Sequence, residues 1–462
     1  MAAYSSPSLV FNVTRKEPEL IVPTKPTPHE FKQLSNIDSQ ESLRYHVPVI
    51  QVYPNKNGVQ EDPVKVMRKA IAKALVFYYP LAGRIREGPR RKLSVECTGE
   101  GLLFIEAEAD VRLDQFSDAD LLPPFPCLDQ LLYEVPGQSD ILNCPILLIQ
   151  VTRLRCGGFI MAIRFNHTMC DGAGISQFLT TVAEFARGAT QPSIPPIWDR
   201  HLLTARHPPH VTHTHLEFTQ IPDDFFPPQS TLIQRSFFFR LNELSALRRQ
   251  LPPKLAHHCS SFDVLTALIW ICRTIALSTD PEEEVRVMSV VNIRSRFNPP
   301  LPAGYYGNGI MFPTTVTTMQ KLMTESMSLE YAVEKVRRAK AEVTEAYVKS
   351  MVDLMEVRER RPLFPLRGSL VVSDLTRIKE MDYGWGKPVY NGVARGGAAD
   401  IGVVTYYIKF KNREGEEGVV VPMALTKEAM MKFEKELIRR GVAGAVGPHK
   451  INGLRGKLSS SL

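Results

Sequence analysis

The sequence lacks any long hydrophobic run. It has no stretch of about eighteen consecutive apolar residues, the length that indicates a membrane-spanning helix. Residues 1–20 also lack the apolar core of a secretory signal peptide. We therefore expect a protein that is neither secreted nor inserted into a membrane. Two matches to the glycosylation acceptor pattern, at Asn12 and Asn166, consequently predict no glycan.

Clustered positive charge and paired cysteines are also scarce. The formal net charge is +7, and no run of Lys and Arg is longer than Arg90-Arg91-Lys92. Nucleic-acid-binding proteins usually concentrate their positive charge, so we do not expect this protein to bind nucleic acid. A mild excess of positive charge is nevertheless suited to an anionic small ligand. The seven cysteines show no C-x-x-C spacing. They predict reduced, mostly buried thiols in an intracellular protein rather than a disulfide framework.

The histidine distribution gives little support for a metal site. Four histidines gather in one proline-rich stretch, at His207, His210, His213 and His215. No cysteine accompanies them, so the spacing does not match a zinc motif. The sequence predicts neither a bound metal nor a bound cofactor.

What is present is typical of a large globular protein with two lobes. Hydrophobic residues make up 44% and charged residues 23%, and 462 residues are too many for one compact core. Helix and strand patterns alternate in both halves, which predicts an α/β or α+β fold. Proline and histidine crowd the region 190–230, the expected connection. We predict a first lobe over 1–215, a connector over 216–235 and a second lobe over 236–462, with the segment around 367–390 as a candidate for packing against the first lobe.

Local patterns in the first lobe predict a strand, a sharp turn and a helix in succession. Two apolar, branched runs over 146–155 and 159–166 flank Cys156-Gly157-Gly158, the pattern of a strand pair. After Gly172, apolar residues recur at helical spacing until about residue 187. An amphipathic helix is predicted over 62–78, where Asp and Pro mark its start.

The second lobe is predicted to combine helices and strands as well. Apolar residues at helical spacing indicate helices near 244–251, over 262–276, from 328 onward and from 426 onward. Strand patterns occur over 287–293, 370–372, 403–411 and 418–421.

His167 lies where the second strand of the pair ends. The odd-numbered residues from Phe159 to Phe165 are large and apolar, so strand alternation sends His167 toward the same interior. A buried histidine is either a hydrogen-bonded core residue or a catalytic one. His167 precedes a turn of small and polar residues, and loops at strand ends commonly carry functional sites. A neutral imidazole can accept the proton of an alcohol that attacks an acyl carbon. Asp171 has three open interpretations: it orients His167, it caps the following helix, or it pairs with a distant arginine.

Two further segments stand out. The segment Asp382-Tyr383-Gly384-Trp385-Gly386 places two glycines beside one of only three tryptophans, which predicts a tightly packed turn. Arg294, followed by several prolines and by Tyr306-Gly307-Asn308, fits either an ordinary loop or phosphate recognition. Neither segment identifies a function alone.

Together these motifs resemble the plant BAHD acyltransferase family, whose members use acyl-CoA. The resemblance is carried by His167-x-x-x-Asp171-Gly172 and by the segment 382–386, in which Tyr383 stands where the family usually has Phe. Residues 78–84, Arg294 and 306–308 also match, in the same order, over residues 9–440. Within the family, segments 23–28, 81–88 and 166–171 are most similar to benzyl alcohol benzoyltransferases and alcohol acyltransferases.

The resemblance implies two similar lobes of the chloramphenicol-acetyltransferase type, with a tunnel between them. His167 would be reachable from both ends and act as the general base, with acyl-CoA at one mouth and the alcohol at the other. Asp171 would point away from the substrate and pair with Arg294. The resemblance further offers Trp385 and Gly384 for oxyanion or acyl binding, Asp382 for a structural part in its motif, and Ser373 and Asp374 for CoA binding.

The implied activity is an acyl-CoA:alcohol O-acyltransferase that makes benzyl benzoate-type esters and CoA from benzoyl-CoA and benzyl alcohol. The alternatives are another pair, such as acetyl-CoA with volatile or phenylpropanoid alcohols, and a non-catalytic acyl-CoA-binding protein. Acyl-CoA would be a co-substrate rather than a bound cofactor. The enzyme would be a monomer that acts in plant specialised metabolism and is linked to salicylic acid precursors. The terminal Ser460-Ser461-Leu462 resembles a peroxisomal address read by an import receptor, and the alternative is a cytoplasmic protein.

Overall fold

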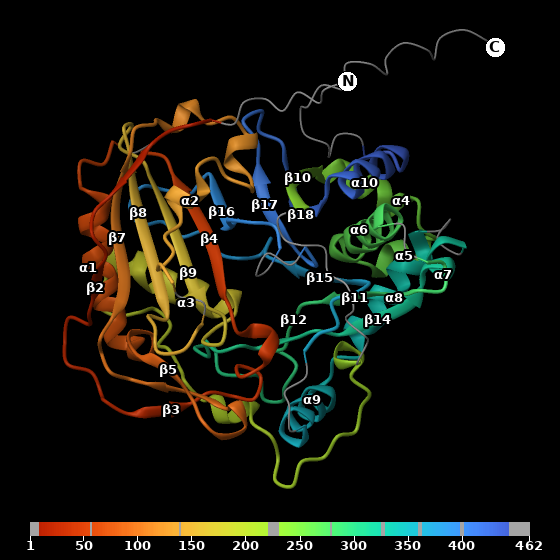
Figure 1. The fold of residues 1–462 in the computed structure, drawn as a ribbon, viewed down its shortest axis with the longest axis horizontal. Helices are drawn as coiled ribbons and strands as arrows, with labels where there is room; N and C mark the ends of the chain where they lie inside the picture. The colour runs from red at the N-terminus through yellow and green to blue at the C-terminus, as the bar shows by residue number, and fades with distance from the viewer. Residues whose placement is uncertain are drawn as a thin grey trace.

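The computed structural model describes residues 9–55, 58–137, 140–219, 231–277, 280–324, 329–358, 363–397 and 402–442. These residues form a mixed α/β protein with two large sheets side by side, each covered by helices (Figure 1). The predicted fold class is therefore confirmed. The predicted peroxisomal tripeptide and much of the predicted connector, residues 220–230, lie outside the described residues.

The first lobe is built on a seven-stranded sheet. Its strands are β1 (Val13–Arg15), β2 (Glu19–Ile21), β7 (Leu102–Ala109), β8 (Leu147–Leu154), β9 (Phe159–Asn166), β4 (His46–Tyr53) and β16 (Tyr390–Val393). A smaller sheet holds β3 (Phe31–Gln33), β6 (Leu93–Glu96) and β5 (Arg84–Glu87). The helices of this half are α1 (Pro63–Phe77), α2 (Leu128–Leu131) and α3 (Gly172–Ala186).

The second lobe is built on a six-stranded sheet. Its strands are β10 (Leu232–Arg240), β18 (Glu417–Thr426), β17 (Val404–Lys411), β15 (Ser369–Asp374), β11 (Glu284–Ser289) and β14 (Thr314–Thr318), and β12 (Val291–Asn292) pairs with β13 (Ile310–Met311) nearby. The helices are α4 (Leu241–Arg249), α5 (Pro253–His258), α6 (Ser261–Leu277), α7 (Met319–Thr324), α8 (Leu329–Ala341), α9 (Glu345–Val357) and α10 (Lys427–Arg439). Within the described residues, no helix has both the length and the apolar character that crossing a membrane requires.

One strand passes from the second half of the chain into the first sheet. β16 pairs antiparallel with β4 and closes the edge of the seven-stranded sheet. The two lobes also share a core in which Ile50, Ile160 and Tyr390 of the first sheet pack with Ile408 and Val420 of the second. Hydrophobic burial thus holds the lobes together along the line where they meet.

The start of α1 and the β8–β9 hairpin follow directly from local sequence. Asp62 accepts a hydrogen bond from the backbone N–H of Val64 at 3.1 Å, and Pro63 occupies the first helical position. β8 and β9 pair antiparallel, as predicted, and β9 also pairs antiparallel with β4. Because His46 opposes Asn166 in that register, the beginning of β4 lies beside the end of β9.

Candidate active site

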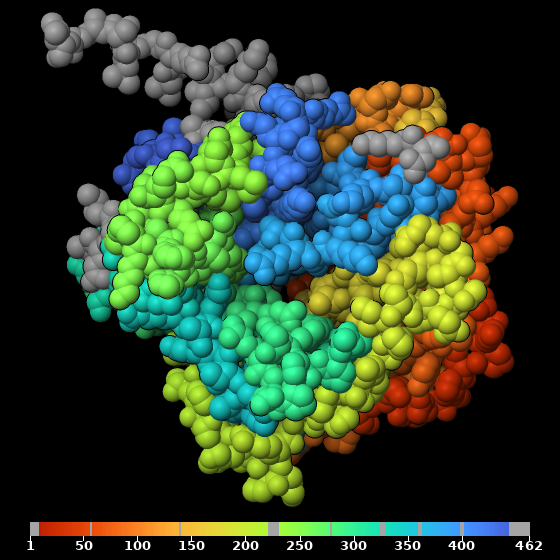
Figure 2. All heavy atoms as spheres, turned by 180° about the vertical axis from the view of Figure 1, so that it is seen from behind, coloured from red at the N-terminus to blue at the C-terminus, as the bar shows by residue number. Residues whose placement is uncertain are grey.

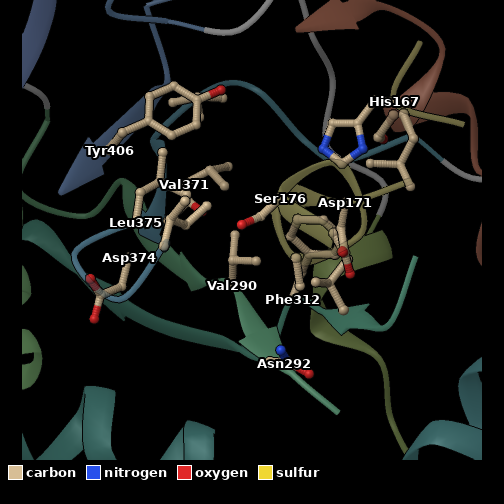
Figure 3. A pocket seen from close by; sticks show the side chains of 18 of the residues that line it. His167, Asp171, Ser176, Val290, Asn292, Phe312, Val371, Asp374, Leu375 and Tyr406 are labelled. Atoms are coloured by element: carbon tan, nitrogen blue, oxygen red, sulfur yellow. The ribbon is translucent and has the colours of Figure 1, made fainter. Parts of the chain in front are cut away.

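A cavity of about 860 Å³ lies between the two lobes. Its walls include Tyr45, His167 and Ser176 from the first lobe and Phe312 and Tyr406 from the second. Figure 3 shows the imidazole of His167 turned toward the space that these side chains enclose. Figure 2 shows the molecular surface hollowed where yellow, green and light-blue segments meet, the same parts of the chain that line the cavity.

His167 occupies the turn that follows β9. Its backbone N–H donates to the carbonyl of Tyr45 at 3.0 Å, and its own carbonyl accepts from Asn308 Nδ2 at 2.8 Å. The imidazole packs edge-on against the Tyr45 ring, with the ring centroids 5.4 Å apart. Nδ1 is buried while the ring lines the cavity, so Nε2 is the nitrogen available to a substrate.

The surroundings of His167 favour its neutral form. Burial lowers the pKa of the imidazole below its ordinary value of 6.5, although the backbone carbonyl of His167 itself, the charge of Asp171 and the Asn308 amide act in the opposite direction. An imidazole that is uncharged near pH 7 has a free lone pair on Nε2. The site therefore holds a proton acceptor in its working form.

Asp171 contributes to the cavity wall, and its carboxylate is held by four donors. Arg294 binds it with two nitrogens at 2.8 and 2.9 Å, and the N–H groups of Gly309 and Gly174 donate at 2.8 and 2.9 Å. Burial opposes ionisation of this carboxyl, but Arg294 and the two backbone donors outweigh it and hold the pKa of Asp171 below its usual range. Two of the open interpretations are thus combined, because Asp171 both caps α3 and pairs with the distant Arg294.

A second buried ion pair lies beneath the same turn, and sequence reasoning did not single it out. Asp38 and Arg200 are fully buried, and Arg200 Nη1 lies 2.8 and 2.9 Å from the two carboxylate oxygens. Asn308 donates to the same carboxylate through its backbone N–H at 3.0 Å and through Nδ2 at 2.9 Å. No motif marks Asp38 or Arg200, since each is a single charged residue in an otherwise unremarked segment. Only the fold brings them together.

Ser373 and Asp374, predicted for CoA binding, end β15 and line the cavity. Asp374 accepts hydrogen bonds from the backbone N–H and hydroxyl of Thr376 at 2.9 and 2.6 Å, which shape the turn after the strand. The Ser373 side chain is partly exposed. Both residues therefore lie where a ligand passing along the second lobe would meet them.

The segment 382–386 lies at the other end of β9. Trp385 packs edge-on against Phe159, the first residue of that strand, with the ring centroids 5.3 Å apart. Eight residues at about 3.3 Å each separate Phe159 from His167, roughly 25 Å in all. Trp385 and Gly384 are not among the described residues that line the cavity. The structure does not bring them to the acyl group that His167 would serve.

Asp382 organises its own segment. Its Oδ1 accepts from the N–H groups of Gly384 and Gly386, both at 2.8 Å, and both glycines have positive φ. The hydroxyl of Tyr383, which stands where the family usually has Phe, donates to Gln51 Oε1 at 3.1 Å. The extra oxygen is thus accommodated by a buried partner on β4.

Known proteins with similar sequences are acyltransferases. A family model described as the Transferase family matches residues 11–439. The benzyl alcohol O-benzoyltransferases of Petunia hybrida and Nicotiana tabacum are each 56% identical over 443 residues, which cover 95% of this chain and 95% of each relative. The (Z)-3-hexen-1-ol acetyltransferase of Arabidopsis thaliana is 50% identical over 93% of this chain and 95% of the relative. This chain belongs to the BAHD acyltransferase family.

Solved structures show the same fold. Vinorine synthase superimposes with a TM-score of 0.70 at 24% identity, covering 93% of this chain and 98% of that one. TRI101 of F. sporotrichioides, complexed with coenzyme A and T-2, gives a TM-score of 0.65 at 16% identity, covering 88% and 97%. The expected chloramphenicol-acetyltransferase-like architecture, the O-acyltransferase activity and acyl-CoA as co-substrate are confirmed for this BAHD protein.

The histidine-rich stretch of this BAHD chain has a structural arrangement of its own. His215 lies between Glu217 at 3.2 Å and Ser350 Oγ at 3.0 Å, an order that resembles a catalytic triad. However, Ser350 is fully buried, and its oxygen already accepts the backbone N–H groups of Thr212 and His213. The group fixes residues 212–217 to α9. In the described part of the chain, no cluster of three or more His, Cys, Asp or Glu side chains could hold a metal ion.

Proposed function

We propose that this acyltransferase joins the benzoyl group of benzoyl-CoA to benzyl alcohol, with His167 as the general base. The observation that carries the proposal is the neutral imidazole of His167, whose buried Nδ1 leaves Nε2 facing a cavity shared by both lobes. Both substrates reach the base at the same time, so that no covalent enzyme intermediate is needed.

The reaction proceeds by direct attack in the ternary complex. Nε2 of His167 takes the hydroxyl proton as the alcohol oxygen attacks the thioester carbonyl. A tetrahedral oxyanion forms, the carbon–sulfur bond breaks, and the imidazolium returns the proton to the CoA thiolate. The ester and CoA then leave a base restored to its neutral form. Asp171 takes no proton, because Arg294 keeps it ionised and it holds the turn that presents His167.

Asn308 adds a positioning role that extends this scheme. For Nε2 to act as a base, the imidazole proton must reside on Nδ1. Both His167 Nδ1 and Asn308 Oδ1 are buried and have no hydrogen-bond partner at ordinary distance in the described structure. The Asn308 amide is already tied to the His167 backbone at 2.8 Å. The Asn308 amide raises the pKa of His167, which is the effect of an acceptor for the ring proton, so Oδ1 favours the tautomer that leaves Nε2 free.

The proposed substrate pair is supported by the lining of the cavity. Tyr45, Phe312, Phe364 and Tyr406 provide aromatic surface, and Val371 and several other aliphatic side chains complete the walls. Aromatic rings pack favourably against such surface, whereas a sugar or a polyamine would lose hydrogen bonds to water. The petunia and tobacco relatives carry the name of the proposed reaction. The second candidate, acetyl transfer to an aliphatic alcohol, is favoured by the hexenol acetyltransferase relative.

A panel of acyl-CoAs against alcohols on the purified enzyme tests the substrate pair. We expect the highest kcat/KM for benzoyl-CoA with benzyl alcohol, and lower values for acetyl-CoA with hexenol. The margin should be modest, because an apolar pocket discriminates by only about 1–3 kcal/mol per methylene group. A higher kcat/KM for acetyl-CoA with an aliphatic alcohol would replace the first candidate by the second. Ester formation that persists in His167→Ala would refute the general-base role.

The proposal also includes a monomeric enzyme that an import receptor carries into the peroxisome, supported by the Ser460-Ser461-Leu462 sequence. Deleting this tripeptide from a chain with an N-terminal fluorescent tag should shift it to the cytoplasm, and an unchanged distribution would remove the claim. Analytical ultracentrifugation tests the monomer. If the esters feed salicylic acid precursors, loss of the gene should lower both esters and salicylic acid.

A further inference from the structure

We infer that the buried Asp38–Arg200 ion pair is a positioning device for His167 that acts through Asn308. The inference rests on the proposed role of His167 as general base. The pair joins three segments that are remote in sequence: Asp38 before β4, Arg200 in the proline-rich stretch 190–230 and Asn308 before β13. None of these side chains touches the cavity among the described lining residues. They act by holding the base, not by contacting substrate.

Asp38 determines which way the Asn308 amide points. Asn308 Nδ2 donates both to Asp38 Oδ1 at 2.9 Å and to the carbonyl of His167 at 2.8 Å. A flipped amide would place its oxygen against two acceptors, which is unfavourable. Oδ1 is therefore left as the buried atom that can accept the Nδ1 proton of His167. Asp38 itself is fixed by the N–H and hydroxyl of Ser35 at 3.0 and 2.6 Å.

Arg200 holds the backbone on the other side of the base. Its Nη2 donates to the carbonyl of Met169, two residues after His167, at 2.8 Å. The guanidinium lies over the Trp198 ring at 4.5 Å from its centroid. It also lies directly on Gly307, where a Cβ would stand 2.0 Å from Nη1. The glycine beside Asn308 is thus needed so that the arginine can approach.

Misorientation of Asn308 has a specific consequence for catalysis. Without Asn308 Oδ1, the ring is left with the backbone carbonyls of His167 and Cys170. Nδ1–H then loses part of its advantage over Nε2–H, and part of the enzyme carries the proton on the wrong nitrogen. The protonated imidazolium also loses a hydrogen-bond acceptor, so that the pKa of His167 falls further. Asp171 and Tyr45 are the other charged or titratable groups that face this ring, and neither contacts the ion pair. A structural contribution to stability alone would leave the pKa unchanged.

The test compares two double variants that differ only in the acceptor at position 38. Asp38→Leu/Arg200→Met removes both charges and the acceptor, whereas Asp38→Asn/Arg200→Met removes both charges but keeps an oxygen for Asn308. The first should lower kcat at least about tenfold, leave the Kd of acyl-CoA nearly unchanged and move the acid limb of kcat/KM to lower pH. The second should recover most of the lost kcat.

A matched ion pair serves as the control. Arg206 also lies in the stretch 190–230, and its Nη2 is 2.7 Å from the buried carboxylate of Asp353 in the second lobe. Neither residue contacts His167 or Asn308. Asp353→Leu/Arg206→Met should lower the melting temperature without changing kcat or the acid limb. The effect of Asp38→Leu/Arg200→Met should also largely vanish in an Asn308→Ala background, because the two changes interrupt the same path.

Several outcomes would overturn the inference. They are a wild-type kcat and acid limb in Asp38→Leu/Arg200→Met, no recovery with the asparagine, or an equally large effect in the Asn308→Ala background. If the leucine variant does not fold, Asn308→Ala removes the proposed acceptor directly, and a wild-type kcat and acid limb in that variant would count against the inference. His167→Ala separates the two proposals: turnover without His167 removes the general base itself, whereas an inactive His167→Ala beside indifferent ion-pair variants removes only the positioning role.

Discussion

Replacing Asp171 by Asn should cost stability at least as much as it costs catalysis. The change removes one partner of a buried ion pair and leaves the Arg294 guanidinium, whose side chain is only 19% exposed, without its counter-charge. Breaking such a pair costs about 3–5 kcal/mol, whereas the helix cap is largely kept, because an asparagine oxygen accepts the Gly174 N–H as the aspartate oxygen does. This loss is a large fraction of the free energy of unfolding, which is about 5–15 kcal/mol in typical folded proteins.

The measurement is the free energy of unfolding in urea from pH 8 down to about pH 2, together with kcat near neutral pH. The pKa of Asp171 is depressed in the folded state, so its contribution is present above the unfolded value of about 3.9 and is lost as the pH falls through the folded pKa. The difference between wild type and Asp171→Asn should therefore be constant near neutral pH and shrink in acid.

A matched variant separates this pair from an ordinary helix cap. Asp62 likewise caps a helix and binds an arginine, Arg153, with two nitrogens, but both side chains are 24% exposed. Asp62→Asn keeps the helix cap and loses only the more exposed ion pair, so it should cost at most about 1 kcal/mol and leave kcat unchanged. An Asp171→Asn enzyme with wild-type stability and a greatly reduced kcat would refute our reasoning, since Asp171 would then act on His167 rather than on the fold.

Four other predictions concern the base and buried contacts elsewhere in the protein. His167→Ala should lower kcat at least about a hundredfold with little change in melting temperature, measured by ester formation and thermal unfolding. Because burial lowers the pKa of His167, the wild-type acid limb of kcat/KM should lie below pH 6.5, and a limb above it would contradict this environment. Tyr383→Phe removes a buried hydrogen bond to Gln51 and should cost about 0.5–1.5 kcal/mol of unfolding free energy without altering kcat. Gly307→Ala forces a methyl group to within 2.0 Å of Arg200 and should greatly reduce the yield of folded protein, so a normal yield would argue against this packing.

Much of the fold could be predicted from sequence because its signals are local. The cap and proline at Asp62-Pro63 predicted α1, the run after Gly172 predicted α3, and the paired runs 146–155 and 159–166 predicted β8 and β9. β16 was missed because Tyr390–Val393 is short and becomes a strand only by pairing with β4. α9 was also missed, because the single helix predicted from 328 onward is in fact two helices, α8 ending at Ala341 and α9 beginning at Glu345.

The residues of the site also differ in whether the sequence could predict them. His167 and Asp171 could be found because one motif carries both, with a strand before it and a helix after it. The Asp38–Arg200 pair could not, since no spacing relates a residue near the start of the chain to one in a proline-rich connector. Trp385 attracted attention because tryptophan is rare, yet its surroundings are those of a core residue packed against Phe159.

The pairing of β16 with β4 has a consequence for how the molecule is made. The first sheet has an open edge until residues 390–393 have emerged from the ribosome, when more than four-fifths of the chain has been synthesised. The first lobe therefore cannot finish folding during synthesis and wait for the second. It also means that a chimera joined at the connector inherits the edge strand of one parent and the rest of the sheet from the other. Exchanges of substrate specificity between relatives should move 390–393 together with the first lobe.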